Sequence, residues 1–241
     1  MGRRSQRDQR LSLAGEPIKV LSGRKAGKKQ GKSCLRDIDR LHVLTDTELQ
    51  SRYSHEELAE LAIAGGAGVI QFRQKHGSTR QMIETARHMQ AICRRRNAKL
   101  IINDRLDVAL AAGADGVHLG QDDFPMALAR QILGPDKIIG GSASTMEEAG
   151  LCLAEGVDYI GLGPVFPTTS KDDAGPAGGL ELVRRVSREF GLPVIAIGGI
   201  DAARASEVIR AGAHGMAVIS AVCCQADPQA AAAELLLAML S

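Results

Sequence analysis

A polar stripe interrupts an apolar segment of this sequence. In Val69–Lys75, the side chains of Gln71, Arg73 and Lys75 lie two residues apart, and residues two apart in a strand share one face. A strand buried in a parallel sheet is normally apolar throughout, and an unpaired buried cation costs several kcal/mol. Arg73 and Lys75 therefore need an anion to face, and a phosphorylated ligand would supply one.

Two acidic turns further along the chain offer oxygen ligands for a hard metal ion. They are Asn103-Asp104 and Gln121-Asp122-Asp123. Taken singly, N-capping of the following helix is the simpler explanation for Asp104 and for Asp123, because Asp is a favoured cap. Taken together, two carboxylates on adjacent strand ends could share one Mg²⁺, which typically binds one or two carboxylates plus substrate phosphates. Cations and carboxylates on one site indicate a metal-bridged phosphate ester.

The elements that must position these groups form a regular alternation from residue 40 onward. Strands are predicted at 41–45, 68–73, 99–103, 116–119, 137–141, 159–163, 193–197 and 215–219. Helices are predicted at 55–65, 78–96, 106–112, 125–133, 145–155, 179–190, 202–211 and 228–240. Parallel strands need such crossover helices, and eight units predict an α/β fold, a single (β/α)8 TIM barrel. A doubly wound sheet would more often carry a Gly-x-Gly-x-x-Gly after its first strand, which is missing here.

Unusual polar groups follow the predicted ends of seven strands, which is where this architecture carries its active site. The Gly198-Gly199 turn suits a phosphate group, because backbone N–H groups can approach it closely. The long loop after the sixth strand is interpreted as a lid whose Lys171 meets an anion. His118 lies inside a strand and is interpreted as a satisfied core histidine. No Ser/His/Asp or Cys/His arrangement stands out, so covalent catalysis is not expected.

Charge and composition divide the chain into an extension, residues 1–38, and a barrel domain, residues 39–241. Of the net charge of +2, the extension contributes +8, with eleven Lys or Arg against three Asp or Glu. We expect it to be a flexible tail, with nucleic-acid contact or organelle targeting as alternatives. The barrel is left with −6 and is not expected to bind nucleic acid. The five cysteines lack metal-site spacing, and no run of about 18 apolar residues occurs. Because the first residues lack an uninterrupted apolar segment, no secretory signal is predicted. A cytoplasmic location without membrane contact is predicted.

The ordered motifs resemble the thiamine phosphate synthase family over about residues 40–241. The matching phrases are Gln-Phe-Arg-Gln-Lys at 71–75, Asn-Asp at 103–104, His-Leu-Gly-Gln-Asp-Asp at 118–123, Gly-Leu-Gly-Pro-Val-Phe-Pro-Thr at 161–168, Lys171, Ile-Gly-Gly-Ile at 197–200 and Ile-Ser at 219–220. Each phrase alone is weak, whereas the ordered set is specific. The resemblance implies a barrel that couples hydroxymethylpyrimidine diphosphate to hydroxyethylthiazole phosphate, giving thiamine phosphate and pyrophosphate.

The resemblance also implies a role for each matching residue. In this family the pyrimidine–oxygen bond breaks first and the thiazole nitrogen captures the carbocation, so the protein supplies no nucleophile. The pyrimidine diphosphate would be held by Gln71, Phe72, Arg73, Gln74, Lys75, Asn103 and Lys171, with Ser142 at the pyrimidine. The thiazole phosphate would be held by Thr168, Ser170, Gly199, Ile219 and Ser220. Asp104 and Asp123 would ligate Mg²⁺, and Arg73, Lys75 and Lys171 would stabilise the departing pyrophosphate.

This sequence departs from the family pattern at some positions, and two alternative functions stay open. The family's usual Ser-x-His-Thr phrase is Ser142-Ala-Ser144-Thr145 here, and Ser170 replaces a threonine but keeps a hydroxyl. A related thiazole tautomerase shares the barrel, but it is not expected to keep Lys171, both aspartates and the Gln-x-Arg-x-Lys phrase together. A non-catalytic paralogue that binds thiamine precursors would not need the Mg²⁺ ligands. The oligomeric state stays open, with a homodimer as one alternative.

Overall fold

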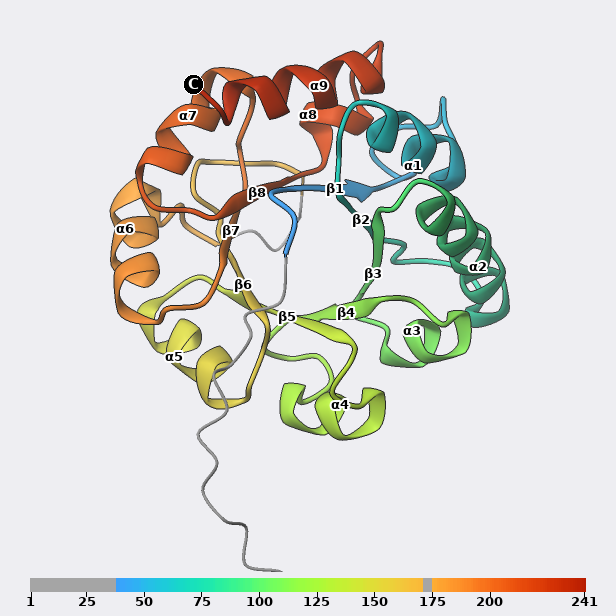
Figure 1. Cartoon of the computed structure of the whole chain (residues 1–241), viewed down its shortest axis with the longest axis horizontal. Coiled ribbons are helices and arrows are strands. Elements are labelled where there is room, and N and C mark those ends of the chain that lie inside the picture. Colours follow the sequence, from blue (N-terminus) through green and yellow to red (C-terminus); the bar gives the residue numbers. More distant parts are fainter. Residues whose placement is uncertain (1–37, 171–174) are drawn as a thin grey trace, which may run out of the picture. The chain divides into compact units, whose positions relative to one another are not determined.

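Eight parallel strands close into a barrel in chain order (Figure 1). The computed structural model describes residues 38–170 and 175–241. The strands are β1 (Leu41–Thr45), β2 (Val69–Phe72), β3 (Lys99–Asn103), β4 (Gly116–Leu119), β5 (Ile138–Ala143), β6 (Tyr159–Leu162), β7 (Val194–Ile197) and β8 (Gly215–Val218). The closing pair is β1 with β8, in which Leu41 lies opposite Met216. The predicted (β/α)8 barrel is confirmed.

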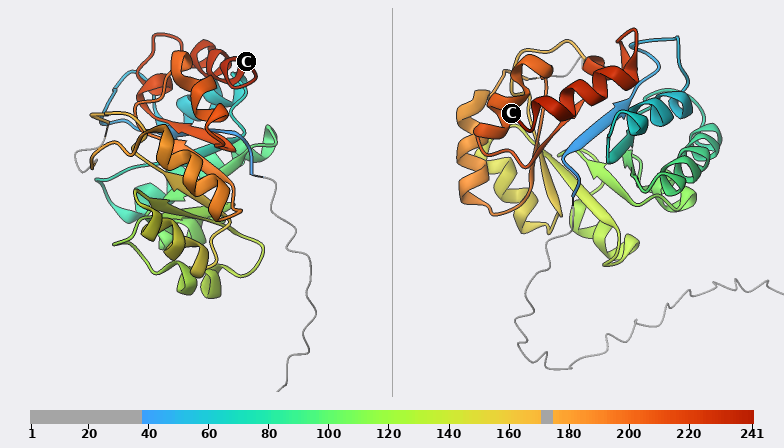
Figure 2. Two further views of the ribbon diagram at one scale, coloured as in Figure 1. Left: turned by 90° about the vertical axis from the view of Figure 1, so that its left-hand side faces the viewer. Right: turned by 45° about the horizontal axis from the view of Figure 1, so that its top comes forward.

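Helices surround the barrel, as Figure 2 shows from two further sides. They are α1 (His55–Ala64), α2 (Thr79–Arg95), α3 (Leu106–Ala112), α4 (Met126–Leu133), α5 (Met146–Ala154), α6 (Gly179–Glu189), α7 (Ala202–Arg210), α8 (Ser220–Cys223) and α9 (Pro228–Ala238). The short helix α8, which directly follows β8, was not predicted. No helix within the described ranges is long and apolar enough to span a membrane. The predicted extension falls outside these ranges, apart from Ile38.

Three strand boundaries differ from the prediction in ways that affect the site. Strand β2 ends at Phe72, so Arg73 and Lys75 follow the strand and are not part of it. Strand β5 continues to Ala143 and therefore contains Ser142, which was expected to follow it. Strand β8 ends at Val218, and Ser220 instead begins α8. Each polar group still lies at the carboxyl end of its strand.

Strand alternation separates two apolar cores. Side chains such as Ile70 and Leu100 face the helices and join the larger core. Their neighbours Val69 and Ile101 face the barrel interior, where they join a smaller cluster that includes Tyr159. Because successive residues of a strand face opposite sides, this pattern fixes which side chains point toward the barrel axis.

An aromatic pair fills part of the barrel interior. The rings of His118 and Tyr159 stack with centroids 5.5 Å apart, and two glycines of the neighbouring strands leave room for them. A Cβ atom on Gly140 would collide with both rings, and one on Gly161 would lie 2.6 Å from His118 Cε1. The glycines in β5 and β6 are therefore a packing requirement of this pair.

The substitution Gly140→Ala is expected to destabilise the protein by about 3 kcal/mol, because the added methyl group overpacks the barrel interior. Urea unfolding measures this loss. The matched control is Gly150→Ala in α5, whose added Cβ would meet only Phe190 at 3.7 Å; this change should leave stability unchanged or raise it by up to about 1 kcal/mol. Equal stabilities for the two variants would contradict the packing argument.

A buried histidine makes stability depend on pH. The ring of His55 lies between two hydroxyls, with Nδ1 2.8 Å from Thr45 Oγ1 and Nε2 3.3 Å from Thr47 Oγ1, and it packs edge-on against Phe72. Burial lowers the pKa of His55 from 6.5 to about 4. The unfolded chain therefore binds this proton more readily than the folded protein does at pH values between 6.5 and 4.

The contribution of His55 is expected to be fully present above pH 6.5 and to be lost as the pH falls toward 4. The loss amounts to roughly 2–3 kcal/mol over this window. Urea unfolding at several pH values should give a shallower acid dependence for His55→Gln, which keeps polar atoms near the two threonines. An identical dependence in the variant and the parent would show that His55 does not carry this effect.

Candidate active site

An open cavity of about 950 Å³ lies at the carboxyl ends of the strands. It brings together most of the residues predicted from the sequence, although they come from seven different strand ends. The predicted residues that line it are Arg73, Lys75, Asn103, Asp104, Asp123, Ser142, Thr168, Ser170, Gly199, Ile219 and Ser220. Lys171 lies outside the described residues.

Three predicted residues do not line the cavity. Phe72 points the opposite way from its neighbours and joins the core between barrel and helices, because adjacent residues of a strand face opposite sides. Gln71 is buried, one layer below Arg73. Gln74 follows the strand and donates to the carbonyl oxygen of His76 at 2.7 Å. The structure therefore does not place these three side chains on the cavity wall, and their role in substrate binding stays a prediction of the resemblance.

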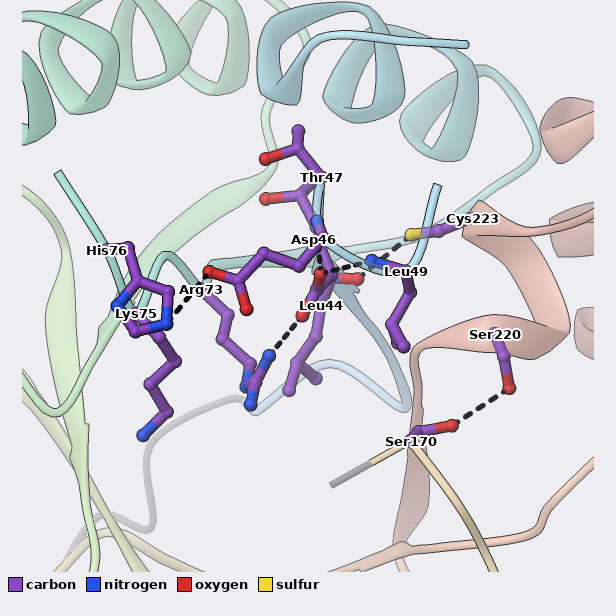
Figure 3. A network of polar contacts seen from close by, with 12 residues as sticks. Leu44, Asp46, Thr47, Leu49, Arg73, Lys75, His76, Ser170, Ser220 and Cys223 are labelled. Atoms are coloured by element: carbon purple, nitrogen blue, oxygen red, sulfur yellow. Dashed lines mark hydrogen bonds and ion pairs between the residues drawn. The ribbon is translucent and has the colours of Figure 1, made fainter. Parts of the chain in front are cut away.

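Arg73 has a carboxylate partner that sequence reasoning missed. The register of β1 and β2 pairs Thr45 with Phe72, which brings Asp46 beside Arg73 one residue further on. Arg73 Nη1 donates to Asp46 Oδ2 (Figure 3), with side-chain exposures of 10% and 1%. The other oxygen of Asp46 accepts the backbone N–H groups of Glu48 and Leu49 at 2.8 and 3.0 Å. Asp46 thus holds both its own turn and the guanidinium.

The Nε atom of Arg73 is buried and has no hydrogen-bond partner among the residues described here. A buried donor of a charged group is costly to leave unpaired. Because Arg73 also lines the cavity, this guanidinium retains capacity for an anionic ligand in addition to Asp46.

Two aspartates and a lysine form an interacting group at the ends of β3 and β4. Lys75 Nζ lies 2.6 Å from Asp104 Oδ2. Burial opposes ionisation of Asp104, but the hydrogen bond and charge of Lys75 outweigh it and hold the pKa of that carboxyl below its usual value. The pKa of Asp123 is raised, first by burial and then by the charge of Asp104. The negative charges of the two carboxylates therefore oppose each other, and the charge of Lys75 offsets this only in part.

The local backbone conformation positions both carboxylates. Asp104 has a left-handed conformation with φ 61°, which is uncommon for a residue other than glycine. Its N–H donates to the carbonyl oxygen of His118 at 2.8 Å. Asp123 Oδ2 accepts the N–H of Gly120 at 2.7 Å, which closes the turn after β4.

Neither aspartate caps the helix that follows it, so the simpler explanation offered by the sequence is wrong for both. The N-cap of α3 is Arg105 and that of α4 is Pro125, and neither makes a side-chain cap hydrogen bond. The carboxylates of Asp104 and Asp123 instead line the cavity.

The carboxylate oxygens of Asp104 and Asp123 fit a hard divalent cation that takes few of its ligands from the protein. Within the described ranges, no group of three or more His, Cys, Asp or Glu side chains converges on one point. Two adjacent carboxylates fit Mg²⁺, which commonly keeps waters and substrate phosphates as its remaining ligands. The mutual repulsion of Asp104 and Asp123 supports the same assignment, because a cation between them would remove it.

The opposite side of the cavity presents neutral hydroxyl groups. Ser170 Oγ and Ser220 Oγ lie 3.1 Å apart (Figure 3), and Thr168 Oγ1 accepts the N–H of Ser170 at 3.2 Å. Gly199 is left-handed with φ 64°. A Cβ atom there would lie 2.6 Å from the carbonyl oxygen of Pro167, so this glycine also permits the turn to pack on the loop after β6.

Two further cavity residues, Arg204 and Glu148, were not found from the sequence. Arg204 Nη1 donates to the carbonyl oxygen of Gly199 at 2.7 Å, and its guanidinium lies 4.9 Å from the centroid of the Phe166 ring. Glu148 Oε2 accepts from the N–H and the hydroxyl of Ser144 at 2.6 and 2.8 Å. Ser144, which replaces the family histidine, is therefore engaged by Glu148.

A family model described as thiamine monophosphate synthase matches residues 41–222, which contain every element from β1 to β8 and all of α8 except its last residue. This chain belongs to the thiamine monophosphate synthase family. The prediction made from the ordered motifs is confirmed, and with it the prediction of an enzyme of thiamine biosynthesis, a transferase that acts on small molecules.

Individual members of the thiamine monophosphate synthase family resemble the chain over most of its length. The thiamine-phosphate synthase of Chloroflexus aurantiacus is 50% identical over 196 residues, covering 81% of this chain and 90% of the relative. The enzyme of the same name from Salinibacter ruber is 52% identical over 198 residues, covering 82% and 87%. The solved thiamine phosphate pyrophosphorylase of Pyrococcus furiosus is 40% identical, with a TM-score of 0.76, over 83% of this chain and 95% of that one.

Proposed function

We propose that this chain joins a hydroxymethylpyrimidine diphosphate to a hydroxyethylthiazole phosphate, with Mg²⁺, and releases thiamine phosphate and pyrophosphate. The observation that carries the proposal is the division of one cavity into two unlike sides. Cations and paired carboxylates lie at the ends of β2 to β4, and a hydroxyl pair lies at the ends of β6 and β8. Family membership supplies the two substrates that such a divided cavity would take.

The charged side suits the diphosphate. Arg73 and Lys75 present two cations to the cavity, and Asn103 adds an amide beside them. Asp104 and Asp123 would hold Mg²⁺, which when bound neutralises charge on the diphosphate oxygens. Lys171, outside the described residues, stays a predicted third cation on the basis of the motif alone.

The hydroxyl side suits the thiazole phosphate. Ser170 and Ser220 offer two hydroxyl donors, and the backbone at Gly199 and Ile219 lies on the same side of the cavity. Loops after the seventh and eighth strands form the recurrent phosphate site of TIM barrels. Thr168 would complete this set from the loop after β6.

The chain's own groups would then act by position and charge. Arg73 and Lys75 would stabilise the negative charge that grows on the departing pyrophosphate. The cavity walls would hold the thiazole nitrogen in line with the carbon that the pyrophosphate leaves, so that ring capture is faster than attack by water. No nucleophile is required of the protein.

Substrate-specific kinetics test this division. Lys75→Gln is expected to raise the KM for the pyrimidine diphosphate by at least about 10-fold with little change in the KM for the thiazole phosphate. Ser220→Ala is expected to do the reverse, raising the thiazole phosphate KM by about 5- to 10-fold. Equal effects of both variants on both substrates would contradict the two-sided assignment.

A cytoplasmic location and a homodimer stay predictions of the sequence.

A further inference from the structure

A chain of hydrogen bonds runs through the barrel interior and ends at the cavity wall. The phenol oxygen of Tyr159 lies 3.0 Å from His118 Nδ1, and His118 Nε2 lies 2.9 Å from Ser142 Oγ. Tyr159 and His118 do not line the cavity, whereas Ser142 does. These hydrogen bonds therefore connect a residue of the cavity wall to two side chains that lie behind it.

The donor and acceptor roles along this series of hydrogen bonds follow from its buried end, Tyr159. Tyr159 is 1% exposed, and burial raises the pKa of its phenol well above its usual value. A neutral phenol carries one proton to donate, and among the described residues the Tyr159 hydroxyl hydrogen-bonds to His118 Nδ1. Nδ1 then acts as the acceptor, and the neutral imidazole carries its proton on Nε2.

The direction of the hydrogen bond between His118 and Ser142 follows from that of the bond between Tyr159 and His118. With its proton on Nε2, His118 donates to Ser142 Oγ, because each nitrogen of a neutral imidazole has the opposite role to the other. The hydroxyl of Ser142 is occupied as an acceptor by His118, so its own proton points elsewhere, and the cavity is the open direction. The backbone of Ser142 is also fixed, because its carbonyl oxygen accepts from Gln121 Nε2 at 2.6 Å.

The surrounding sequence is built to hold these rings. Side chains on Gly140 or Gly161 would displace the pair, and the ring of His42 packs edge-on against Tyr159 with centroids 5.3 Å apart. A polar pair in the middle of a barrel core is costly unless its hydrogen bonds are satisfied. Two glycines and a third ring keep it in one arrangement.

We propose that Tyr159 and His118 are positioning residues that fix the Ser142 hydroxyl as a hydrogen-bond donor toward the cavity. The ligand atom at this point is then an acceptor, such as a ring nitrogen of an aminopyrimidine, and not the exocyclic amino group. The identity of this ligand rests on the proposed function, whereas the direction of the hydrogen bonds does not.

The direction is tested by NMR on the full-length protein without ligand. Two-bond ¹⁵N–¹H correlation spectra of the imidazoles distinguish the two tautomers, and loss of one ring's signals in His118→Gln assigns them. The expected result is a neutral His118 with its proton on Nε2, whose Nδ1 resonance moves in Tyr159→Phe. The matched control is Tyr53→Phe, which removes the chain's other phenol from a bond to the Ala226 carbonyl oxygen and should leave the Nδ1 resonance unmoved. A proton on Nδ1 would overturn the proposal.

The ligand is tested with two pyridine analogues of hydroxymethylpyrimidine diphosphate, each keeping one of the two ring nitrogens. By calorimetry, the parent protein is expected to bind one analogue about 10-fold more tightly than the other, and Ser142→Ala to bind them within about twofold of each other. Equal binding by the parent, or an unchanged preference in Ser142→Ala, would overturn the assignment of Ser142 as donor. If the pyrimidine diphosphate itself does not bind, the proposed function fails, and the NMR result still decides the direction of the bonds.

Discussion

Replacing Asp123 by Asn is expected to lower kcat/KM by about 10²–10³-fold while the fold stays as stable as before or becomes more stable. The activity should fall because one of the two carboxylates that would hold Mg²⁺ is lost. Stability should not fall, because Asn keeps an oxygen for the N–H of Gly120 and removes the repulsion between Asp123 and Asp104. Active-site groups are often placed at a cost to stability, and this pair is such a case.

Measurements of kcat/KM across a range of Mg²⁺ concentrations and of urea unfolding without Mg²⁺ check this result. Asp104→Asn should lose activity similarly, but it also leaves Lys75 without its anion. The matched control is Asp107→Asn on α3, which removes an exposed carboxylate paired with Arg105 outside the cavity. It should retain activity within about twofold. Full activity of Asp123→Asn at limiting Mg²⁺ would remove Asp123 from the metal site.

The second large effect concerns Asp46. Asp46→Asn is expected to cost about 3–5 kcal/mol of stability, because the amide presents a donor to the Arg73 guanidinium and leaves a buried charge without its partner. The oxygen that accepts from Glu48 and Leu49 can be kept by the asparagine. Activity should also fall at least about 10-fold, because Arg73 is no longer held against the cavity wall.

A double variant separates the two effects. Combining Asp46→Asn with Arg73→Gln removes both charges and should recover much of the stability lost in either single variant, as measured by urea unfolding. Activity should stay low, because the guanidinium is gone. If Asp46→Asn alone is as stable and active as the parent, the ion pair does not have the importance that its burial indicates.

The barrel and its cavity were predictable because their signals are local and repeated. Each strand reads as a short apolar run between helical segments, and the polar residues after each run meet at one end of any such barrel. Asp104 and Asp123 were found in this way, since a carboxylate at a strand end is visible in the sequence. The structure adds the reason that they are not helix caps.

Asp46 could not be found in this way, because its partner is 27 residues distant along the chain and only the register of β1 and β2 brings them together. Tyr159 was missed because a tyrosine in an apolar strand resembles any other core residue. Phe72 was included with its motif without regard to the side it faces, and strand alternation places its side chain on the helix-facing side. Contacts between strands, and the side a motif residue faces, need the three-dimensional arrangement.

The central claim is tested most directly by incubating the purified protein with hydroxymethylpyrimidine diphosphate, hydroxyethylthiazole phosphate and Mg²⁺ while following both products. Pyrophosphate and thiamine phosphate are expected in equal amounts, only when both substrates are present, and EDTA should abolish both. Binding of either substrate without formation of thiamine phosphate would contradict the proposed coupling reaction.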